Sequence, residues 1–592
     1  MAFPQRLFEI PNYQLDHYAN DKMFVTKVDG IWQPISIHSF LEQVLQFSKA
    51  LVAYGVQPGD KIGLISNNRF EWNIMDIAIQ QVGAIVVPIY PNISVSDYRY
   101  IFNDAKIKIC FVGDEDLLSK IESIHAEIST LEHLFIFDAD TKSHVKSHWK
   151  NMLARSVEID ESEIERRKGG IKHEDLVTII YTSGTTGNPK GVMLSHKNIL
   201  SNVMACKFTI PADNNSKVLS FLPVCHIYER MLHYLYMYLG CSIHFAESME
   251  TIGDNIREVQ PEVFTAVPRL IEKVYDKILA KGEALTGLKR KLFFWAVALA
   301  EEYDVHGKSA FYNFKLGIAR KLIFSKWQLA LGGKVRAIAS GSAALQPRLA
   351  RIFLAAGIPI LEGYGLTETS PVVSVNCLKR GLRIGSVGPV IEGVEVKIAE
   401  DGEILVKGPN VMMGYFNLPE ATKEVMDAEG WFHTGDIGEF IEGIFLKITD
   451  RKKEIFKTSG GKYIVPQAME NKFKESRFIE QIMVIGENQK YPAALIVPNF
   501  LFVKEWANRK KIDLGDKSNP SIVANQVVID RIQKEVDHYN ELYGKWEKIK
   551  QFVLLPNEMS IDGGELTPTL KLKRKKIMEK YADLVVKIYV GE

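Results

Sequence analysis

The chain has 592 residues, with 73 lysines and arginines against 72 aspartates and glutamates, so its formal net charge is +1. This balance lacks the basic surplus of most nucleic-acid-binding proteins, and 46% hydrophobic with 24% charged residues excludes global disorder. At roughly 150 residues per domain, the length allows about two to four domains and excludes a single small module.

Five cysteines are spread along the chain without a CxxC pair. This argues against a disulfide framework or a cysteine-rich zinc site, and it fits a reducing compartment. The N-terminus (MAFPQRLFEIPNYQ) has no long apolar region. Residues 77–96 are uncharged, but Gln80, Gln81, Pro88 and Pro91 predict a helix, a turn and a buried strand there. We expect a cytoplasmic protein without a membrane span, and peripheral membrane contact stays open.

Helical and strand patterns alternate over the first 450 residues. Residues 39–54 have apolar side chains at helical spacing, and 61–66 (KIGLIS) has the apolar run of a buried strand. The pattern repeats with a helix over 72–82 and a strand over 84–89. Further strands are predicted at 177–181, 217–222, 242–245, 263–266 and 335–340. Strands that alternate with helices indicate parallel sheets covered by helices on both faces.

A long helical region over residues 281–332 mixes aromatic and aliphatic residues with lysine and arginine. Two interpretations stay open for it. The first is a pair of amphipathic helices packed on the core, and the second is a surface that faces a membrane or lines an acyl-chain channel.

The pattern of predicted secondary structure changes after residue 385. Short strands at 394–398, 402–407, 437–440 and 445–448 are separated by glycines and charged turns, which indicates a compact antiparallel subdomain. A charged stretch follows, and then a helix at 466–474 with strands at 482–485 and 493–497. The predicted fold is α/β: a large N-terminal domain (1–449) has two parallel-type sheets flanked by helices plus a small β subdomain. A small mobile α+β C-terminal domain covers 450–592.

Residues 181–191 (YTSGTTGNPKG) follow an apolar strand and form the strongest motif. Glycines permit close backbone approach, while successive N–H groups and hydroxyls can surround phosphate oxygens. Lys190 adds a positive charge at the end of the loop. The spacing differs from the GxxxxGK[ST] loop, and the alternative interpretation is a flexible turn.

Four weaker motifs follow in the chain. Residues 362–369 (EGYGLTET) present an aromatic ring for base stacking and a carboxylate beside a hydroxyl for Mg²⁺. The TGD at 434–436 places a carboxylate at a strand where it can accept both hydroxyls of a ribose. Residues 450–461 (DRKKEIFKTSGG) join the domains, and 564–574 (GELTPTLKLKR) lie near the C-terminus. Each motif alone has a simpler interpretation. In chain order these are a tight turn, a surface turn, a solvated linker and a basic tail helix.

Together and in this order, the motifs resemble the adenylate-forming superfamily, which includes acyl-CoA synthetases, aryl-CoA ligases, luciferases and peptide-synthetase adenylation domains. The resemblance extends from about residue 13 to 581. Within it, LPVCHIYER (222–230), SGSAAL (340–345) and LTPTLKLKR (566–574) are similar to long-chain fatty acid–CoA ligases. The resemblance implies that a fatty acid reacts with ATP to give an acyl-adenylate and pyrophosphate, after which coenzyme A takes the acyl group and AMP leaves.

The resemblance also implies roles for individual residues. Contacts to the β- and γ-phosphates are expected from Thr182, Ser183, Gly184, Thr185, Thr186, Gly187 and Lys190. The adenine pocket is expected to contain Ser342, Ala343, Glu362, Gly363 and Tyr364, and the ribose is expected to bind Asp436 and Arg451. Thr367 would touch the α-phosphate, and Glu368, with Thr185, would bind Mg²⁺.

Further roles concern the acyl group and the C-terminal domain. His226 is expected at the acyl carboxylate or the channel gate, with a core histidine as the alternative. Lys453 occupies the hinge position, and the CoA tunnel would include Ser459, Gly460 and Gly461. Lys571 is the candidate adenylation lysine because Lys571-x-x-Arg574 keeps the family spacing. The usual preceding glycine is Leu570 here, so Lys573 is its rival. Arg230 lies near the place where some relatives have a gating tryptophan.

Rival functions remain at this stage. One is an acyl-AMP ligase or acyl-carrier-protein synthetase, which passes its product to a carrier protein. Another is a nucleotide or acyl-ligand sensor without catalysis, although Glu368 and Lys571 are both present. The expected partners are a long-chain fatty acid, ATP and CoA, with no nucleic acid. A homodimer and peripheral membrane contact stay open.

Overall fold

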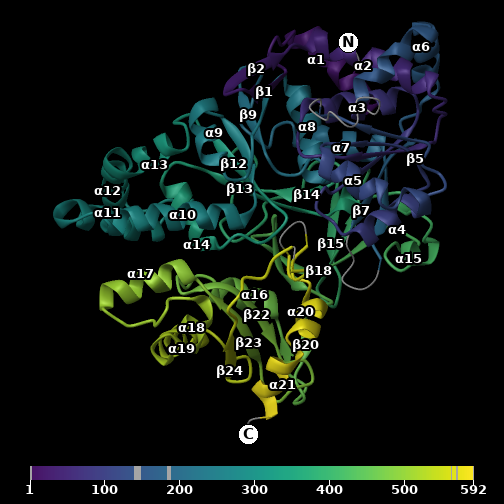
Figure 1. The fold of residues 1–592 in the computed structure, drawn as a ribbon. Helices are drawn as coiled ribbons and strands as arrows, with labels where there is room; N and C mark the ends of the chain where they lie inside the picture. The colour runs from purple at the N-terminus through teal and green to yellow at the C-terminus, as the bar shows by residue number, and fades with distance from the viewer. Residues whose placement is uncertain (1–2, 139–147, 183–187, 562, 568–570, 591–592) are drawn as a thin grey trace.

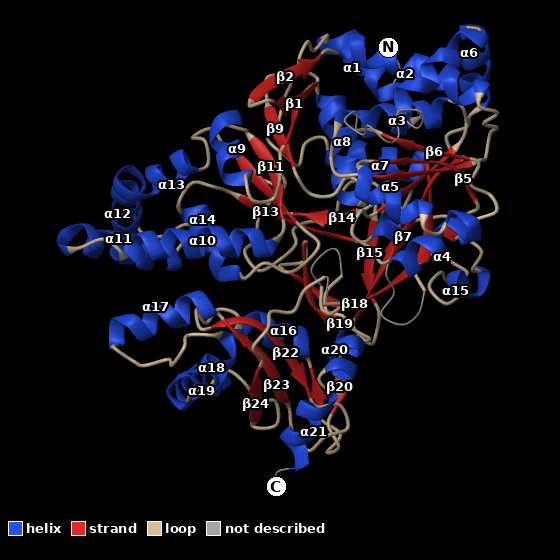
Figure 2. Cartoon of the chain, viewed as in Figure 1, coloured by secondary structure: helices blue, strands red, loops and turns tan. Residues whose placement is uncertain are grey.

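The computed structural model describes residues 3–138, 148–182, 188–561, 563–567 and 571–590. A large N-terminal part contains two major sheets and a small antiparallel sheet, and the C-terminal part lies beneath it (Figure 1). Figure 2 shows that helices cover the sheets of the large part. This α/β arrangement confirms the predicted fold class.

The first major sheet has eight strands. In spatial order they are β14 (Val372–Val375), β13 (Ile360–Gly365), β12 (Ala337–Ser340), β11 (Val263–Ala266), β9 (Lys217–Ser220), β10 (Ser242–Phe245), β1 (Phe24–Val28) and β2 (Ile31–Ile35). The inner strands pair in parallel, whereas the two outermost pairs are antiparallel. The sequence pattern predicted β9, β10, β11 and β12, but it predicted neither β1 and β13 nor the antiparallel edges.

The second major sheet has seven strands. Their order is β17 (Gly414–Tyr415), β8 (Lys190–Ser195), β7 (Leu176–Thr182), β4 (Ile85–Ile89), β3 (Lys61–Ile65), β5 (Ile107–Val112) and β6 (His133–Ile136). The pairs β7–β8 and β8–β17 are antiparallel, and the remaining pairs are parallel. The phosphate-type motif therefore joins two strands of a hairpin.

Four helices contribute to the largest hydrophobic core: α2 (Ile37–Ala53), α3 (Phe70–Gln81), α7 (His196–Cys206) and α8 (Ile227–Leu239). In α2 the buried residues Phe40, Val44, Phe47 and Leu51 recur at helical spacing, so one face meets the core. The hydroxyl of Ser36 accepts a hydrogen bond from the Ser39 N–H and caps this helix.

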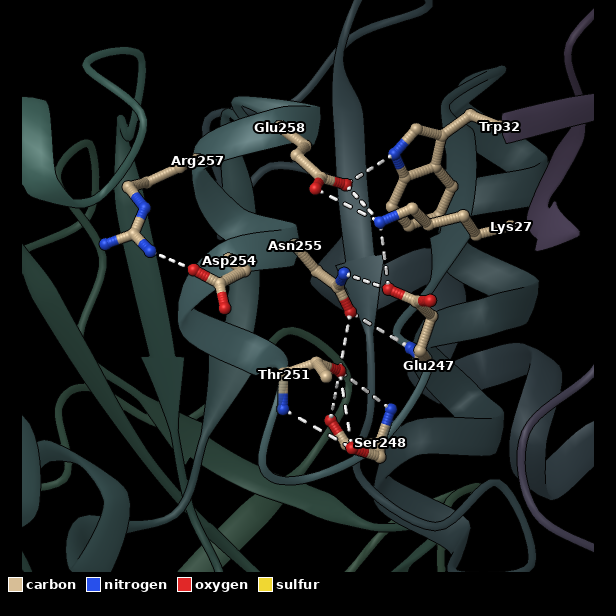
Figure 3. A network of polar contacts seen from close by, with 9 residues as sticks. All are labelled: Lys27, Trp32, Glu247, Ser248, Thr251, Asp254, Asn255, Arg257 and Glu258. Carbon is tan, nitrogen blue, oxygen red and sulfur yellow. Dashed lines mark hydrogen bonds and ion pairs between the residues drawn. The ribbon is translucent and has the colours of Figure 1, made fainter. Parts of the chain in front are cut away.

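A polar network attaches the N-terminal hairpin β1–β2 to α9 (Ile252–Val259) at the edge of the eight-stranded sheet (Figure 3). Lys27 donates to Glu247 and Glu258, each at 3.1 Å, and the Trp32 indole donates to Glu258 at 3.0 Å. Asn255 orients Glu247 through a 2.7 Å hydrogen bond. These contacts tie the hairpin to α9 and to the loop before it.

The small antiparallel sheet contains β15 (Glu395–Ile398), β16 (Glu403–Lys407), β18 (Phe432–Ile441) and β19 (Phe445–Arg451). Its strand pairs are all antiparallel, as the sequence predicted for this region. Strand β19 runs to Arg451, two residues past the predicted domain boundary, and the boundary itself stays a prediction.

The C-terminal part has a hydrophobic core of its own. Strands β22 (Ile479–Ile485), β23 (Ala493–Pro498) and β24 (Gln551–Leu554) form its sheet, and β20 (Phe456–Lys457) pairs with β21 (Tyr463–Ile464). Its helices are α16 (Pro466–Phe473), α17 (Phe500–Lys510), α18 (Asn519–Ala524), α19 (Gln526–Asn540), α20 (Arg574–Lys580) and α21 (Ala582–Val590).

The helical region predicted at 281–332 forms α11 (Gly287–Glu301), α12 (Ala310–Ala319), a π-helical turn (Arg320–Phe324) and α13 (Ser325–Ala330). Together with α10 (Pro268–Glu283) and α14 (Pro347–Ala355), these helices share a second hydrophobic core. Figure 1 shows α11 and α12 at the outer left edge of the molecule. Within the described ranges, no helix has both the length and the apolar character needed to cross a membrane.

Candidate functional site

Several predicted site residues follow strands that end at one edge of the eight-stranded sheet. Strands β9, β11, β12 and β13 are parallel neighbours, so their carboxyl ends meet there. The loop with His226 follows β9, and the loop with Ser342 and Ala343 follows β12. The carboxyl ends of parallel strands are the usual place for ligand sites in such sheets.

Glu362 connects two of these stretches. It lies within β13 opposite Ser340 of β12, and its buried carboxyl group accepts a hydrogen bond from the Leu345 backbone N–H. Burial raises the pKa of Glu362 to about 8. Ser342 has a φ of 70°, a left-handed conformation that is strained for a residue with a side chain. Such strain concentrates at functional sites.

Tyr364 and Asp436 bring the second and third motifs into contact. The Tyr364 hydroxyl donates to Asp436 Oδ2 at 2.7 Å, and Arg451 Nε donates to Asp436 Oδ1 at 2.9 Å. Asp436 and Arg451 are direct partners across β18 and β19. A Cβ at Gly365, beside Tyr364, would lie 1.8 Å from the Pro371 carbonyl oxygen, so this close turn requires glycine.

The phosphate-type motif begins and ends on paired residues, because Thr182 of β7 faces Lys190 of β8. The predicted phosphate-binding residues Ser183, Gly184, Thr185, Thr186 and Gly187 lie outside the described residues. Lys190 Nζ lies 4.9 Å from the ring centroid of Tyr415. The Tyr415 hydroxyl in turn donates to Glu368 Oε1 at 2.9 Å. Tyr415 therefore connects the first motif with the second.

Glu368 has the properties of a carboxylate that could bind Mg²⁺. It is half-buried, and its backbone carbonyl accepts from the Met412 N–H at 2.8 Å. Tyr415 orients one carboxylate oxygen, while Oε2 accepts no hydrogen bond from the part of the chain that is described. Thr367 is buried next to it in the same short turn (Thr367–Thr369). No cluster of three or more His, Cys, Asp or Glu residues suited to a metal ion occurs among the described residues.

Lys571 reaches this group from the C-terminal part. Its ammonium group interacts electrostatically with Arg451, Asp436 and Glu368. Desolvation by the surrounding protein, followed by repulsion from Arg451, lowers the pKa of Lys571. The yellow segment before α20 lies between the two parts of the molecule in Figure 1.

The rival Lys573 is placed differently. It precedes α20, and its backbone N–H donates to the Glu565 carbonyl oxygen at 2.7 Å. The next residue, Arg574, anchors the segment by donating to Glu454 at 3.1 Å and to Glu470 at 2.6 Å. Lys571 therefore precedes an anchored helix start.

His226 lies on the loop between β9 and α8, where its ring nitrogen accepts from the Tyr228 N–H at 3.1 Å and caps α8. Burial, followed by repulsion from Lys571, lowers the pKa of His226 to about 4, so the ring is neutral at pH 7. Asn68 holds the same loop from outside the motif. Its amide donates to Ser220 Oγ at 2.8 Å and to the Leu222 carbonyl at 2.6 Å. Its oxygen accepts from the Val224 N–H at 2.8 Å.

Arg230 is a structural residue of the core. It is fully buried and pairs with Asp76 of α3, while it also donates to the Thr178 hydroxyl at 2.7 Å. These contacts tie α8 to α3 and β7. Arg230 therefore does not act as a gate in this conformation, in line with its departure from the relatives' tryptophan.

The predicted hinge and CoA-tunnel residues are exposed. Lys453 is exposed directly after β19. Ser459, Gly460 and Gly461 form the exposed turn between β20 and β21, where the Ser459 N–H donates to the Gln489 carbonyl within the C-terminal part. A cavity of about 480 Å³ separates α14 from α16 and includes Arg348, Arg351 and Lys472 in its lining. It contains none of the predicted site residues.

Two residues that touch the site were missed by the sequence reasoning. Tyr415 lies between the motifs at 362–369 and 434–436 without a pattern of its own, and Asn68 is a single asparagine after strand β3. Their importance comes from contacts made by residues distant in the chain. The sequence offered one signal for Asn68: it is a polar residue just after a buried parallel strand, where site residues are commonly found.

Two family models match this chain. Residues 13–416 match the model of the AMP-binding enzymes, and residues 453–592 match that of the AMP-binding enzyme C-terminal domain. The chain belongs to this family. The match confirms the resemblance found in the motifs and covers both parts of this AMP-binding enzyme.

Curated relatives match over nearly their full length. Long-chain-fatty-acid–CoA ligase FadD15 of Mycobacterium bovis is 32% identical over 98% of this chain and 96% of the relative. Long-chain-fatty-acid–CoA ligase 1 of Homo sapiens is 31% identical over 93% of this chain and 82% of the relative. Among solved structures, a fatty acyl CoA synthetase of Mycobacterium tuberculosis has a TM-score of 0.61 at 18% identity, covering 98% of this chain and 99% of that chain. The adenylation domain of a carboxylic acid reductase from Segniliparus rugosus has a TM-score of 0.74 at 19% identity, over 99% of this chain and 94% of that chain. These structures share the fold.

Proposed function

We propose that this AMP-binding enzyme is an ATP-dependent long-chain fatty acid–CoA ligase. It joins a fatty acid to ATP with release of pyrophosphate, and it then transfers the acyl group from the adenylate to coenzyme A with release of AMP. The near full-length similarity to long-chain-fatty-acid–CoA ligases from distant organisms carries this proposal. The approach of Lys571 to Glu368, Asp436 and His226 supports the adenylation step.

The proposed nucleotide site follows the motifs. Thr182 and Lys190, with residues 183–187 between them, would bind the β- and γ-phosphates. The adenine would lie among Ser342, Ala343, Glu362, Gly363 and Tyr364, and the ribose hydroxyls would bind Asp436, which Tyr364 and Arg451 already orient. Thr367 would contact the α-phosphate. Glu368, with Thr185, would hold Mg²⁺, which would neutralise phosphate charge as pyrophosphate leaves.

The first half-reaction needs charge neutralisation more than proton transfer. A fatty acid carboxylate must approach an anionic α-phosphate, and the reaction makes its oxygen part of a better leaving group. The ammonium group of Lys571 would reduce the repulsion between the two anions. His226 would contact the carboxylate as a neutral ring, because its lowered pKa keeps it uncharged at pH 7.

The second half-reaction would use a different arrangement of the C-terminal part. Lys453 would absorb the backbone change as the hinge between domains 1–449 and 450–592. Rotation would withdraw Lys571 and bring the turn of Ser459, Gly460 and Gly461 towards the nucleotide, where it would line the CoA tunnel. The exposure of this turn and its distance in sequence from Lys571 are compatible with such an exchange.

A screen of pyrophosphate release with carboxylic acids of increasing length tests the substrate class. Each buried CH₂ contributes about 0.8 kcal/mol, so activity should rise steeply for chains longer than about ten carbons until the pocket ends. Residues 231–246 and 292–331 are the candidate wall material. A best substrate among acetate, benzoate and amino acids would contradict the long-chain assignment. AMP release with free CoA, compared with CoA plus a carrier protein, separates the ligase from the carrier-protein alternative.

A further inference from the structure

Asp104 is a carboxylate at an unfavourable place in its helix. It lies in the last turn of α4 (Val95–Ala105). Free backbone carbonyls give this end of a helix a partial negative charge, so a lysine or arginine is preferred there and a carboxylate is repelled. Among the described residues, Asp104 takes part in no ion pair. Neither its own helix nor a basic side chain therefore accounts for its presence.

Two neutral side chains hold this carboxylate by hydrogen bonds. The Tyr181 hydroxyl donates to Asp104 Oδ2 at 2.5 Å. The Asn417 amide donates to Oδ1 at 3.2 Å and to the Asp104 carbonyl oxygen at 3.3 Å. Burial, followed by the hydrogen bond to Asp104, raises the pKa of Tyr181, so its hydroxyl keeps the proton that it donates. Both carboxylate oxygens thus have a donor from another segment of the chain.

The two donors come from the two sides of strand β8. Tyr181 of β7 pairs with Gly191 of β8, and the Gly191 carbonyl oxygen accepts from the Phe416 N–H at 2.7 Å. Asn417 is the next residue after Phe416. A Cβ at Gly191 would lie 3.2 Å from Tyr181 Cζ, so the glycine leaves room for the Tyr181 ring beside β8. Asp104 therefore links the end of β7 to the segment after β17, across β8.

The linked segments carry two residues of the proposed nucleotide site. Lys190 directly precedes Gly191, and its Nζ lies 4.9 Å from the ring centroid of Tyr415. Tyr415 lies two residues before Asn417, and its hydroxyl donates to Glu368 Oε1 at 2.9 Å. A shift of either linked segment would therefore change the separation of the Lys190 ammonium group and the Glu368 carboxylate.

We propose that Asp104 is a positioning residue, which sets Lys190 and Glu368 at the separation that the triphosphate of ATP and its magnesium ion require. It acts through Tyr181 and Asn417 and not by contact with the nucleotide. A neutral residue would suit the end of α4 better, and such a departure from local preference is typical of residues kept for a site. This role rests on the proposed binding of ATP, and it is the same for any acid or acyl acceptor.

Nucleotide binding to the full chain, measured by isothermal titration calorimetry without acid or CoA, tests the proposal. Asp104→Ala should weaken the binding of ATP with Mg²⁺ about tenfold, because a hydrogen bond to a charged group changes an equilibrium constant by about this factor or more. AMP lacks the β- and γ-phosphates, so its dissociation constant should change by less than about twofold. A general loss of structure would weaken the binding of both nucleotides.

Two further variants separate the contact from the fold. Asp104→Asn keeps the size of the side chain and one acceptor oxygen, so it should weaken ATP binding by roughly threefold. Tyr181→Phe removes the hydroxyl donor and should also weaken ATP binding. The double variant of Tyr181→Phe and Asp104→Ala should bind ATP no more weakly than Asp104→Ala alone, because both changes remove the same hydrogen bond.

Asp97→Ala is the matched control in the same helix. Asp97 lies in the first turn of α4, where its carboxylate accepts from the Ser94 hydroxyl at 2.8 Å. The substitution removes a charge that is favourable at this helix end. Both nucleotides should nevertheless bind as they do to the wild type, and thermal unfolding of each variant would verify its fold.

Three results would overturn the role of Asp104. The first is wild-type affinity for ATP in both Asp104→Ala and Asp104→Asn. The second is an equal loss of affinity for ATP and AMP. The third is a loss in Asp97→Ala as large as that in Asp104→Ala. The expected pattern of nucleotide binding, in a wild-type protein that forms no thioester with free CoA, would instead contradict the ligase assignment and support the role of Asp104.

Discussion

The carboxyl group of Glu362 joins two sequence motifs through one hydrogen bond to the Leu345 backbone. It lies in an apolar environment, so burial raises its pKa to about 8. A protonated carboxyl group would be the main form at neutral pH. In that form Glu362 acts as a hydrogen-bonding group of the proposed adenine pocket and adds little charge near the nucleotide.

This environment gives a pH-dependent prediction for stability. The folded-state pKa of Glu362 lies above its unfolded value, so the stabilisation it gives is complete at low pH and is lost as pH rises through about 8. Glu362→Gln mimics the protonated group at every pH. Its melting temperature should therefore rise relative to that of the wild type between mildly acidic and alkaline pH, as measured by thermal unfolding.

An exposed carboxylate provides the control for this measurement. Glu420→Gln removes a charge from α15 (Pro419–Lys423), where the side chain is exposed beside Lys423. Its melting temperature should follow the wild type across the same pH range. A Glu362→Gln curve parallel to the wild type would show that Glu362 is ionised in the folded protein.

At the scale of elements, the sequence predicted strands better than their directions. The apolar run 177–181 correctly indicated β7 (Leu176–Thr182), because a buried strand needs such side chains whatever its partner. The antiparallel partner β8 was not predicted, since apolar content does not encode strand direction. The same limit applies to Asn68 and Tyr415, whose partners are distant in the chain.

The loop between β9 and α8 depends on Asn68 for its shape. Asn68→Ala would leave the Leu222 carbonyl and the Val224 N–H without their partner, and an unsatisfied buried group costs about 1–3 kcal/mol. The loop should relax and move His226. We expect kcat/KM for the fatty acid to fall about tenfold while KM for ATP stays near the wild-type value, because the proposed role of His226 on this loop is contact with the fatty acid carboxylate and not with ATP.

The neighbouring asparagine tests whether this effect is specific. Asn67 is exposed, and Asn67→Ala should leave both Michaelis constants unchanged. Equal losses for the fatty acid and for ATP in Asn68→Ala would indicate a general structural defect. The positioning role assigned to Asn68 would then be rejected.

At the scale of the whole molecule, ion pairs hold the C-terminal part in its present position. Glu283 of α10 pairs with Arg477 and, at 3.2 Å, with Arg509 of α17, while Arg269 of α10 pairs with Glu480 of β22. These pairs are partly exposed, so each is weak and sensitive to salt. A weak interface suits a domain that must leave one position and adopt another.

The position of Lys571 predicts that the two half-reactions can be separated. Lys571→Ala removes the positive charge beside Glu368 and Asp436, and loss of one strong electrostatic contact commonly costs roughly 10²–10³ in rate. The rate of acyl-adenylate formation from acid and ATP should therefore fall by about this factor. Given preformed acyl-adenylate and CoA, the same variant should still make thioester, because the rotated domain would have withdrawn this residue.

Lys573→Ala, which keeps the backbone hydrogen bond to Glu565, is the matched control and should retain adenylation. A dead Lys573→Ala would shift the motif assignment by two residues, whereas equal loss of both half-reactions in folded Lys571→Ala would contradict the domain alternation.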